Sequence, residues 1–235
     1  MLGLKLCGVL RRRGFYVIGS YHNDTGLLRD VDIFKKIRFD ITSEKSVEKL
    51  KKVFIRLDAI IHCAAMTEVN LCERNKKRCF AANVIGTKHV VDLASHFNAK
   101  LIYISTPMVF SGIRGNYTEQ SRPKPLNYYS RTKLFGEREA LKYNRSLVLR
   151  VNPIGIRPPG AHPSFIQWFA WVVKKNQSFN LFSDVFINPL STSTLSGVIA
   201  KLIKDFRPGT LHLGSRDVVN KADIWKIVAA RFPHF

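Results

Sequence analysis

The sequence contains few acidic residues, few cysteines and no long apolar segment. Its 235 residues include 17 Asp and Glu against 38 Lys and Arg, a formal net charge of +21. The four cysteines form no C-x-x-C pair, and no group of histidines completes a zinc site. No apolar run approaches the roughly 18 residues of a membrane span, and the basic residues 11–13 follow the apolar N-terminal residues, the reverse of a signal peptide. We therefore expect reduced thiols, no metal, no membrane contact and a cytoplasmic location.

The excess of basic residues is spread along the chain rather than concentrated in one arm. A positive surface attracts polyanions, but no helix-turn-helix, RNA-recognition signature or zinc finger accompanies it. Basic groups occur mostly on expected helix faces or ends, at 11–13, 35–36, 51–52, 76–78 and 174–175. We expect no specific nucleic-acid partner, and a field that favours a nucleotide sugar or a phosphorylated cofactor.

Strand patterns and helix patterns alternate along most of the chain. Apolar strand-like runs are expected at 15–21, 33–39, 57–63, 101–105 and 147–151. Helices are expected at 2–12, 42–54, 69–78, 80–97, 129–143, 165–175, 192–205 and 221–231. This alternation predicts an α/β fold with a doubly wound, mainly parallel, Rossmann-like sheet. After a change of composition at 153–163, we expect a small C-terminal lobe, interleaved with the core, with short strands near Phe179 and Leu211.

One helix carries the residues with the clearest chemical meaning. Tyr129 and Lys133 are four residues apart, so their side chains lie on the same helix face. A neighbouring ammonium stabilises a phenolate and brings the tyrosine pKa down, which makes Tyr129 a usable general acid. Thr106, which follows the apolar run 101–104, could donate a second hydrogen bond to the same carbonyl oxygen. A Y-x-x-x-K spacing also arises by chance, but with Thr106 it predicts a nicotinamide-dependent carbonyl reductase.

Seven short motifs occur in an order typical of one enzyme family. In chain order they are 39–42, 61–67, 83–87, 104–106, 109–112, 125–129 and 133–137. With these motifs the chain resembles the extended short-chain dehydrogenase/reductase family, and within it the sugar-nucleotide-binding branch of the dTDP-4-dehydrorhamnose reductases of dTDP-rhamnose biosynthesis. The resemblance covers nearly the whole chain. It implies an NAD(P)-binding domain in residues 1–152 and a substrate-binding lobe in residues 153–235.

The resemblance also implies a place for each site residue. Thr106 would lie near the reacting carbonyl, and Tyr129 and Lys133 would lie at the nicotinamide ribose. Asp40 and Ile41 would lie against the adenine. The full set of expected cofactor contacts, besides Tyr129 and Lys133, is Gly3, His22, Asp40, Ile41, Cys63, Ala64, Ala65 and Met66.

Several of these residues have a simpler structural interpretation. Asp40 could merely begin a turn before its helix, and Ala64 and Ala65 could serve only close packing. Cys63 could be a small core residue, since free cysteine is usually buried. The resemblance makes Asn83 a residue that positions a helix.

The sequence departs from the family pattern in three places. The family opens with a strand and a glycine-rich turn that holds the pyrophosphate, whereas here only residues 1–3, at the start of the first expected helix, remain. We therefore expect unpaired backbone groups beside strand 15–21, poor stability or cofactor binding, an internal methionine at Met1, and a missing piece after Phe235. Pro107 and Met108 stand where Asp-Tyr is usual, and segment 150–155 contains no tryptophan, which leaves the sugar open.

These features lead to one expected activity and three alternatives. We expect NADPH, or NADH, because residues 20–23 contain no acidic side chain to accept from a ribose 2′-hydroxyl. The expected reaction is reduction of a 4-keto nucleotide sugar with Tyr129 as the proton donor, with a homodimer as one option. The alternatives are a nucleotide-sugar epimerase or dehydratase, a non-catalytic binding or regulatory subunit such as the related β-subunit of methionine adenosyltransferase, and an inactive fragment.

Overall fold

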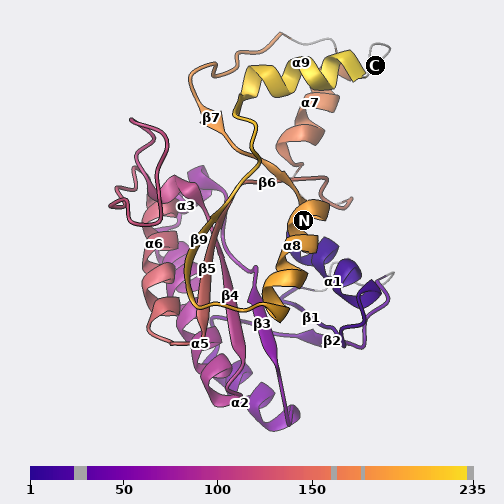
Figure 1. Cartoon of the computed structure of the whole chain (residues 1–235), viewed down its shortest axis with the longest axis vertical. Helices are drawn as coiled ribbons and strands as arrows, with labels where there is room; N and C mark the ends of the chain where they lie inside the picture. Colours follow the sequence, from indigo (N-terminus) through magenta and orange to yellow (C-terminus); the bar gives the residue numbers. More distant parts are fainter. Residues whose placement is uncertain (24–30, 160–162, 176–177, 232–235) are drawn as a thin grey trace.

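The protein is built around a parallel β-sheet with helices on both faces (Figure 1). The computed structural model describes residues 1–23, 31–159, 163–175 and 178–231, so residues 160–162 of the expected boundary segment and 232–235 lie outside the described residues. The main sheet has the order β3-β4-β5-β9, and all its strands are parallel. Its strands are β3 (Ala59–His62), β4 (Lys100–Ser105), β5 (Ser146–Val151) and β9 (Gly209–Leu213).

Alternating residues of these strands supply two hydrophobic cores, one on each face. Ile102 and Leu149 face the core that contains α1 (Leu2–Arg12) and α8 (Thr192–Lys204). Leu101, Tyr103 and Val148 face the opposite core. That core contains α2 (Glu44–Val53), α5 (Gly86–His96) and α6 (Tyr128–Leu141). Strand side chains alternate between the two faces of a sheet. The apolar residues of these strands are therefore buried in one core or the other. The predicted doubly wound α/β fold is confirmed.

The first helix shows how the sequence sets this packing. Leu2, Leu6 and Leu10 are spaced four residues apart, so they form one apolar stripe on α1 and are all buried. The helix packs against α8, and the two lie side by side on one face of the sheet in Figure 1. Gly14, which follows the helix, has a φ of 82°, a conformation that glycine adopts without strain.

Two strands near the N-terminus form a separate parallel pair. β1 (Ile18–Tyr21) pairs with β2 (Lys35–Arg38). Within the described ranges, no strand pairing joins β1 to β3, so the other edge of β1 has no ladder partner. The expected unpaired backbone groups beside strand 15–21 stay a prediction.

The segment between β3 and β4 is helical but not one regular helix. α3 (Val69–Arg74) and α4 (Lys76–Phe80) come first, and residues 81–85 form a π-helical turn, Ala81–Ile85, before α5 begins. A regular helix over 80–97 was expected. The structure instead has a π-helical turn that carries Asn83, whose side chain binds the backbone of Met66 in the segment after β3. Such turns occur frequently at functional sites.

The C-terminal part contributes both to the core and to a lobe above it. α8 and β9 belong to the core, whereas α7 (Phe165–Lys174) packs against α9 (Lys221–Arg231) beyond the end of the sheet (Figure 1). Short strand pairs connect the two regions: β6 (Pro153–Ile154) with β8 (Leu190–Ser191), and β7 (Phe186–Ile187) with β10 (Val219–Asn220).

The expected strand near Phe179 is wrong. Residues 178–182 form no strand, and the Phe179 ring instead contacts Trp225, with 4.7 Å between ring centroids, and Trp168, at 5.3 Å. Phe179 therefore packs between α7 and α9. The apolar pattern around it reflects contacts with these helices rather than a place in a sheet. The strand expected near Leu211 is confirmed as β9. Among the described residues, no helix is long and apolar enough to cross a membrane.

Candidate active site

Thr106, Tyr129 and Lys133 come together at the carboxyl end of β4. Thr106 follows the strand, and its Oγ1 accepts a hydrogen bond of 3.2 Å from the Met108 N–H, which fixes a short 3₁₀ turn, Pro107–Val109. Tyr129 lies in the first turn of α6, and Lys133 lies one turn later. The side chains of Thr106 and Tyr129 are hydrogen-bonded, and all three residues are buried. The structure therefore assembles the predicted group from two elements.

The start of α6 is fixed by a cap that places Tyr129. Asn127 is the N-cap, and its Oδ1 accepts hydrogen bonds of 2.9 Å from both the N–H and the hydroxyl of Ser130. Asparagine is among the best N-cap residues because its side chain satisfies a free N–H of the first turn. The Tyr128 N–H donates to Glu73 of α3 at 2.7 Å, which ties the helix start to a second element.

The environment of Tyr129 acts on its pKa in the direction opposite to the one predicted. Burial raises the pKa of Tyr129 to about 12, against a smaller lowering by the hydrogen bond with Thr106. The predicted lowering by Lys133 is wrong for this structure. The Lys133 Nζ donates to the Ile104 carbonyl oxygen at 2.7 Å and lies 4.0 Å from the centroid of the Tyr103 ring. Its ammonium is thus directed to β4, and the phenol of Tyr129 stays protonated at neutral pH.

Lys133 is itself strongly affected by burial. Burial lowers its pKa from 10.5 to about 7, and the Glu137 carboxylate opposes this by favouring the charged form. A lysine removed from water loses the hydration of its ammonium, which is the usual cause of such a shift. The side chain therefore changes charge near neutral pH.

Asn83 holds the segment after β3 against α6. Its Oδ1 accepts from the Met66 N–H at 2.8 Å, and its Nδ2 donates to the Met66 carbonyl at 2.9 Å and to Thr132 Oγ1 at 3.0 Å. Asn83 was predicted to position a helix. In the structure its side chain also holds the loop that follows β3. The close approach requires Gly136, because a Cβ there would lie 2.7 Å from the Asn83 carbonyl oxygen.

The expected cofactor residues fall into two groups in space. Gly3, in the first turn of α1, lies beside Cys63, with 3.6 Å between a Cβ built at Gly3 and the Cys63 Cβ. Cys63, Ala64, Ala65 and Met66 follow β3 directly, and Ala64 is exposed. The surrounding protein raises the pKa of the Cys63 thiol to about 12, mainly by desolvation. The start of α1 and the end of β3 thus face each other next to Lys133, whose charge acts on Cys63.

The second group lies at the ends of β1 and β2. His22 Nε2 is 3.5 Å from Asp40 Oδ2, and Asp40 Oδ1 accepts from the Thr42 N–H at 2.9 Å and from its hydroxyl at 2.7 Å. These bonds to Thr42 are the main reason that the pKa of Asp40 is lowered. Asp40 therefore does begin a turn, as its simpler interpretation held. The Ile41 side chain packs against Gly86, where a Cβ would lie 2.7 Å from Ile41 Cδ1.

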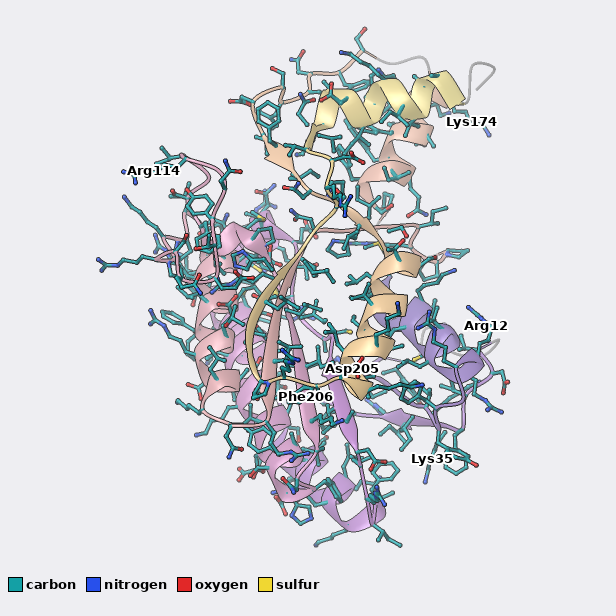
Figure 2. All side chains as sticks on the ribbon, viewed as in Figure 1. Arg12, Lys35, Arg114, Lys174, Asp205 and Phe206 are labelled. Carbon is teal, nitrogen blue, oxygen red and sulfur yellow. The ribbon has the colours of Figure 1, made fainter. Side chains whose placement is uncertain are left out.

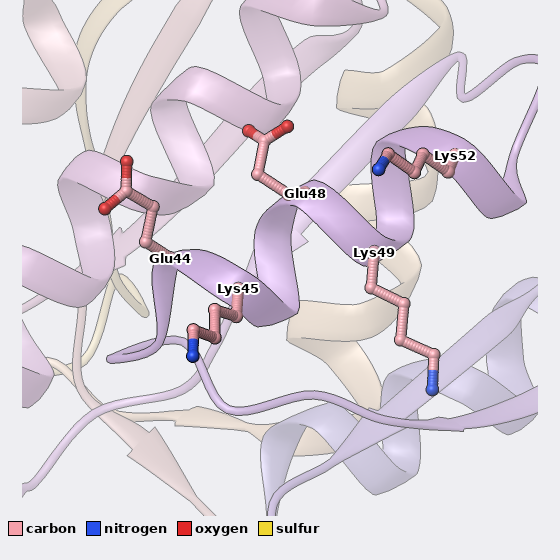
Figure 3. A pocket seen from close by; sticks show the side chains of 5 residues that line it. All are labelled: Glu44, Lys45, Glu48, Lys49 and Lys52. Atoms are coloured by element: carbon pink, nitrogen blue, oxygen red, sulfur yellow. The ribbon is translucent and has the colours of Figure 1, made fainter.

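Two features of the described residues lie outside this site. A shallow depression on α2 is lined by side chains of that helix alone: Glu44, Lys45, Glu48, Lys49 and Lys52 (Figure 3). In Figure 2 Arg114 and Lys174 lie in different parts of the molecule, and Arg12 and Lys35 lie together on a third. In the part of the chain that the structure describes, no group of three or more His, Cys, Asp or Glu side chains could hold a metal ion.

Comparison with known proteins places the chain in a family. A model described as the RmlD substrate binding domain matches residues 1–234. The chain belongs to this family. The predicted resemblance to the dTDP-4-dehydrorhamnose reductase branch is thereby confirmed.

Three similar proteins represent the range of the comparisons. The probable low-salt glycan biosynthesis reductase Agl14 of Haloferax volcanii is 29% identical over 231 residues, which are 95% of this chain and 74% of that protein. The crystal structure of a dTDP-4-dehydrorhamnose reductase from Bacillus anthracis in complex with NADP has a TM-score of 0.77 and 27% identity, and covers 87% of this chain and 73% of that chain. The methionine adenosyltransferase 2 subunit beta of Xenopus laevis is 37% identical over 113 residues, 48% of this chain and 34% of that protein.

Proposed function

We propose that the protein is a reductase that transfers a hydride from NADPH, or NADH, to the keto group of a 4-keto nucleotide sugar. The observation that supports this most strongly is the buried group of Thr106, Tyr129 and Lys133 at the carboxyl end of β4. Ligands of open α/β sheets bind outside the carboxyl ends of the strands. The names of the relatives, a glycan biosynthesis reductase and a dTDP-4-dehydrorhamnose reductase with NADP, agree with this activity.

The residues around the site fit a dinucleotide. Small residues follow β3, and exposed Ala64 leaves the backbone there approachable. The N-terminus of α1 beside Cys63 offers N–H groups suited to a phosphate. Gly3 and residues 63–66 would hold the pyrophosphate side of the cofactor, His22, Asp40 and Ile41 the adenosine side, and Tyr129 and Lys133 the nicotinamide ribose. When bound, the cofactor supplies the hydride.

In the proposed reaction, the protein's own residues handle the proton and the developing charge. As the hydride reaches the carbonyl carbon, Tyr129 Oη gives its proton to the carbonyl oxygen, and the product is an alcohol. The raised pKa of Tyr129 keeps this proton in place before the reaction. Thr106 donates a hydrogen bond to the same oxygen, and Lys133, one helical turn after Tyr129, binds the nicotinamide ribose.

The substrate would lie between this site and the C-terminal residues 153–235. Met108, which is half exposed beside Thr106, would contact the sugar where the family usually has a tyrosine. Association into a homodimer stays a prediction.

A direct assay tests the proposed function. NADPH oxidation is followed with dTDP-4-dehydrorhamnose as the probe substrate, for the unchanged protein, for Y129F and for Y128F as the matched control on the same helix turn. We expect a fall of about 10²- to 10⁴-fold in kcat for Y129F and no such loss for Y128F. Equal turnover by Y129F and the unchanged protein would contradict the proposal.

A second candidate function is a non-catalytic subunit. The similarity to methionine adenosyltransferase 2 subunit beta supports it, because that relative is a subunit of another enzyme by name. A binding subunit should not depend on one hydroxyl, so Y129F would bind a methionine adenosyltransferase catalytic subunit as well as the unchanged protein does. Binding of that subunit together with no reduction of the keto sugar would favour this candidate.

A further inference from the structure

A buried carboxylate lies one helical turn beyond Lys133. Glu137 on α6 is 1% exposed, and its two oxygens accept hydrogen bonds from Arg150 on β5, at 3.0 Å from Nε and 2.7 Å from Nη2. The Ser105 hydroxyl donates to Glu137 Oε1 at 2.5 Å. The carboxylate therefore binds the helix to two strands of the sheet.

The register of the sheet places these partners in one row. Ser105 on β4 stands opposite Arg150 on β5, which stands opposite His212 on β9. Arg150 Nη1 is 3.1 Å from His212 Nε2, and its guanidinium lies 5.0 Å from the centroid of the Phe110 ring.

The row continues into the segment between Thr106 and α6. The backbone N–H of His212 donates to Glu119 Oε1 at 2.8 Å, and its Nδ1 is 3.1 Å from the Tyr117 carbonyl oxygen. The Phe110 ring is stacked on the Tyr117 ring, with 4.5 Å between centroids. Glu137 is thus the inner end of a polar network that crosses three strands and reaches this segment.

The network is attached to both halves of the candidate site. Ser105 precedes Thr106 in the chain, and Glu137 follows Tyr129 and Lys133 at intervals of four residues on the same helix face. A buried ion pair is often no more stabilising than an apolar pair of similar size, so stability alone does not explain a charge here. We propose that Glu137 is a positioning residue, which holds Thr106 and Lys133 in a fixed relation by binding Ser105 and Arg150.

The charge of Glu137 has a second consequence for Lys133. Among the groups that act on the ammonium, Glu137 is the first that favours the charged form, followed by Cys63 and Cys79. His62 on β3 also faces Lys133, and the Tyr103 ring on β4 covers it. Removing the Glu137 charge should therefore shift the titration of Lys133 to lower pH.

The test compares E137Q with E139Q, which removes a charge from the same helix at a side chain that pairs with Lys142 near the end of the helix. The titration of Lys133 is measured by NMR with lysine labelled at ¹³Cε, and its signal is assigned by its loss in K133M. We expect a lower midpoint in E137Q and an unchanged one in E139Q. In the reductase assay, E137Q should lose about 10- to 100-fold in kcat, with a smaller change in KM and an alkaline limb moved to lower pH.

A second variant separates positioning from folding. In E137L/R150M the ion pair is replaced by apolar residues, so cooperative unfolding should be retained, while kcat stays low and the Lys133 midpoint stays below that of the unchanged protein. An unchanged midpoint and unchanged kcat in folded E137Q or E137L/R150M would overturn the proposal. The kinetic part rests on the proposed function. The NMR titration needs no turnover, so an inactive wild-type protein would contradict the proposed function without deciding the role of Glu137.

Discussion

The four-stranded sheet and the β1–β2 pair differ sharply in how firmly they hold their side chains. Every residue of β5 is buried, whereas three of the four residues of β2 are exposed. Thr106, Tyr129 and Lys133 are attached to the first region, and His22 and Asp40 to the second, where their side chains are 56% and 36% exposed. Sites on rigid elements hold geometry best. The proton-transfer residues therefore have a fixed arrangement, and the expected adenosine-side residues have a looser one.

The largest expected effect is on the stability of the main sheet. Leu149 on β5 is fully buried in the core beside α1 and α8, so L149A should lower the free energy of unfolding by about 2 to 5 kcal/mol. The matched change I37A on β2, where the residue is only partly buried, should cost clearly less. Urea unfolding measures both, and an equal loss for the two variants would remove the contrast between the regions.

Acid should weaken the main sheet through His62. Burial lowers the pKa of His62 from 6.5 to about 3, so the folded protein binds fewer protons than the unfolded chain between these values. The contribution of neutral His62 to the free energy of unfolding is therefore fully present above pH 6.5 and is lost as the pH falls toward 3. We expect a loss of about 2 kcal/mol between pH 7 and pH 5. H62Q should reduce this loss, and H96Q on the exposed face of α5 should not. The measurement is urea unfolding at both pH values, and an identical acid loss in H62Q would contradict it.

Lys133 should make the free energy of unfolding rise as the pH increases above 7, by less than the acid effect of His62. Its pKa is lowered to about 7 in the folded protein, so the unfolded chain binds more protons above this value and stability rises with pH. Between pH 7 and about 8 we expect a gain of about 1 kcal/mol, because at higher pH the buried thiols of Cys63 and Cys72, whose pKa values are raised, act in the opposite direction. K133M should lose this gain, whereas K142M, on the exposed end of α6, should retain it.

The smallest expected effect concerns the β1–β2 region. D40A removes the hydrogen bonds to Thr42 and should cost about 0.5 to 1.5 kcal/mol in unfolding free energy. H22Q, which breaks only the contact with Asp40 on the surface, should cost less than about 1 kcal/mol. Either variant is measured by thermal unfolding. A loss for H22Q as large as that for L149A would show that this region is as firmly held as the main sheet.

Much of the fold could be predicted because its signals are local. Apolar strand patterns and the four-residue stripe of α1 predicted the alternating elements, and the cap at Asn127 lies two residues before the expected start of the helix with Tyr129. The signal near Phe179 misled because an apolar run does not reveal whether it meets a strand or a helix. The π-helical turn at Asn83 was missed because its bonds to Met66 join segments that are distant in sequence.

The sequence by itself determined the parallel α/β order, and it placed Tyr129 and Lys133 on one helix face, because both depend on spacing along the chain. Only the tertiary structure decided their protonation. The Lys133 ammonium donates to the Ile104 carbonyl and lies over the Tyr103 ring, and burial raises the pKa of Tyr129. The row from Glu137 through Arg150 to His212 likewise exists only because strand register aligns distant residues. Desolvation and long-range hydrogen bonds depend on the groups that surround a side chain in the folded protein. The spacing of residues along the chain does not specify those groups.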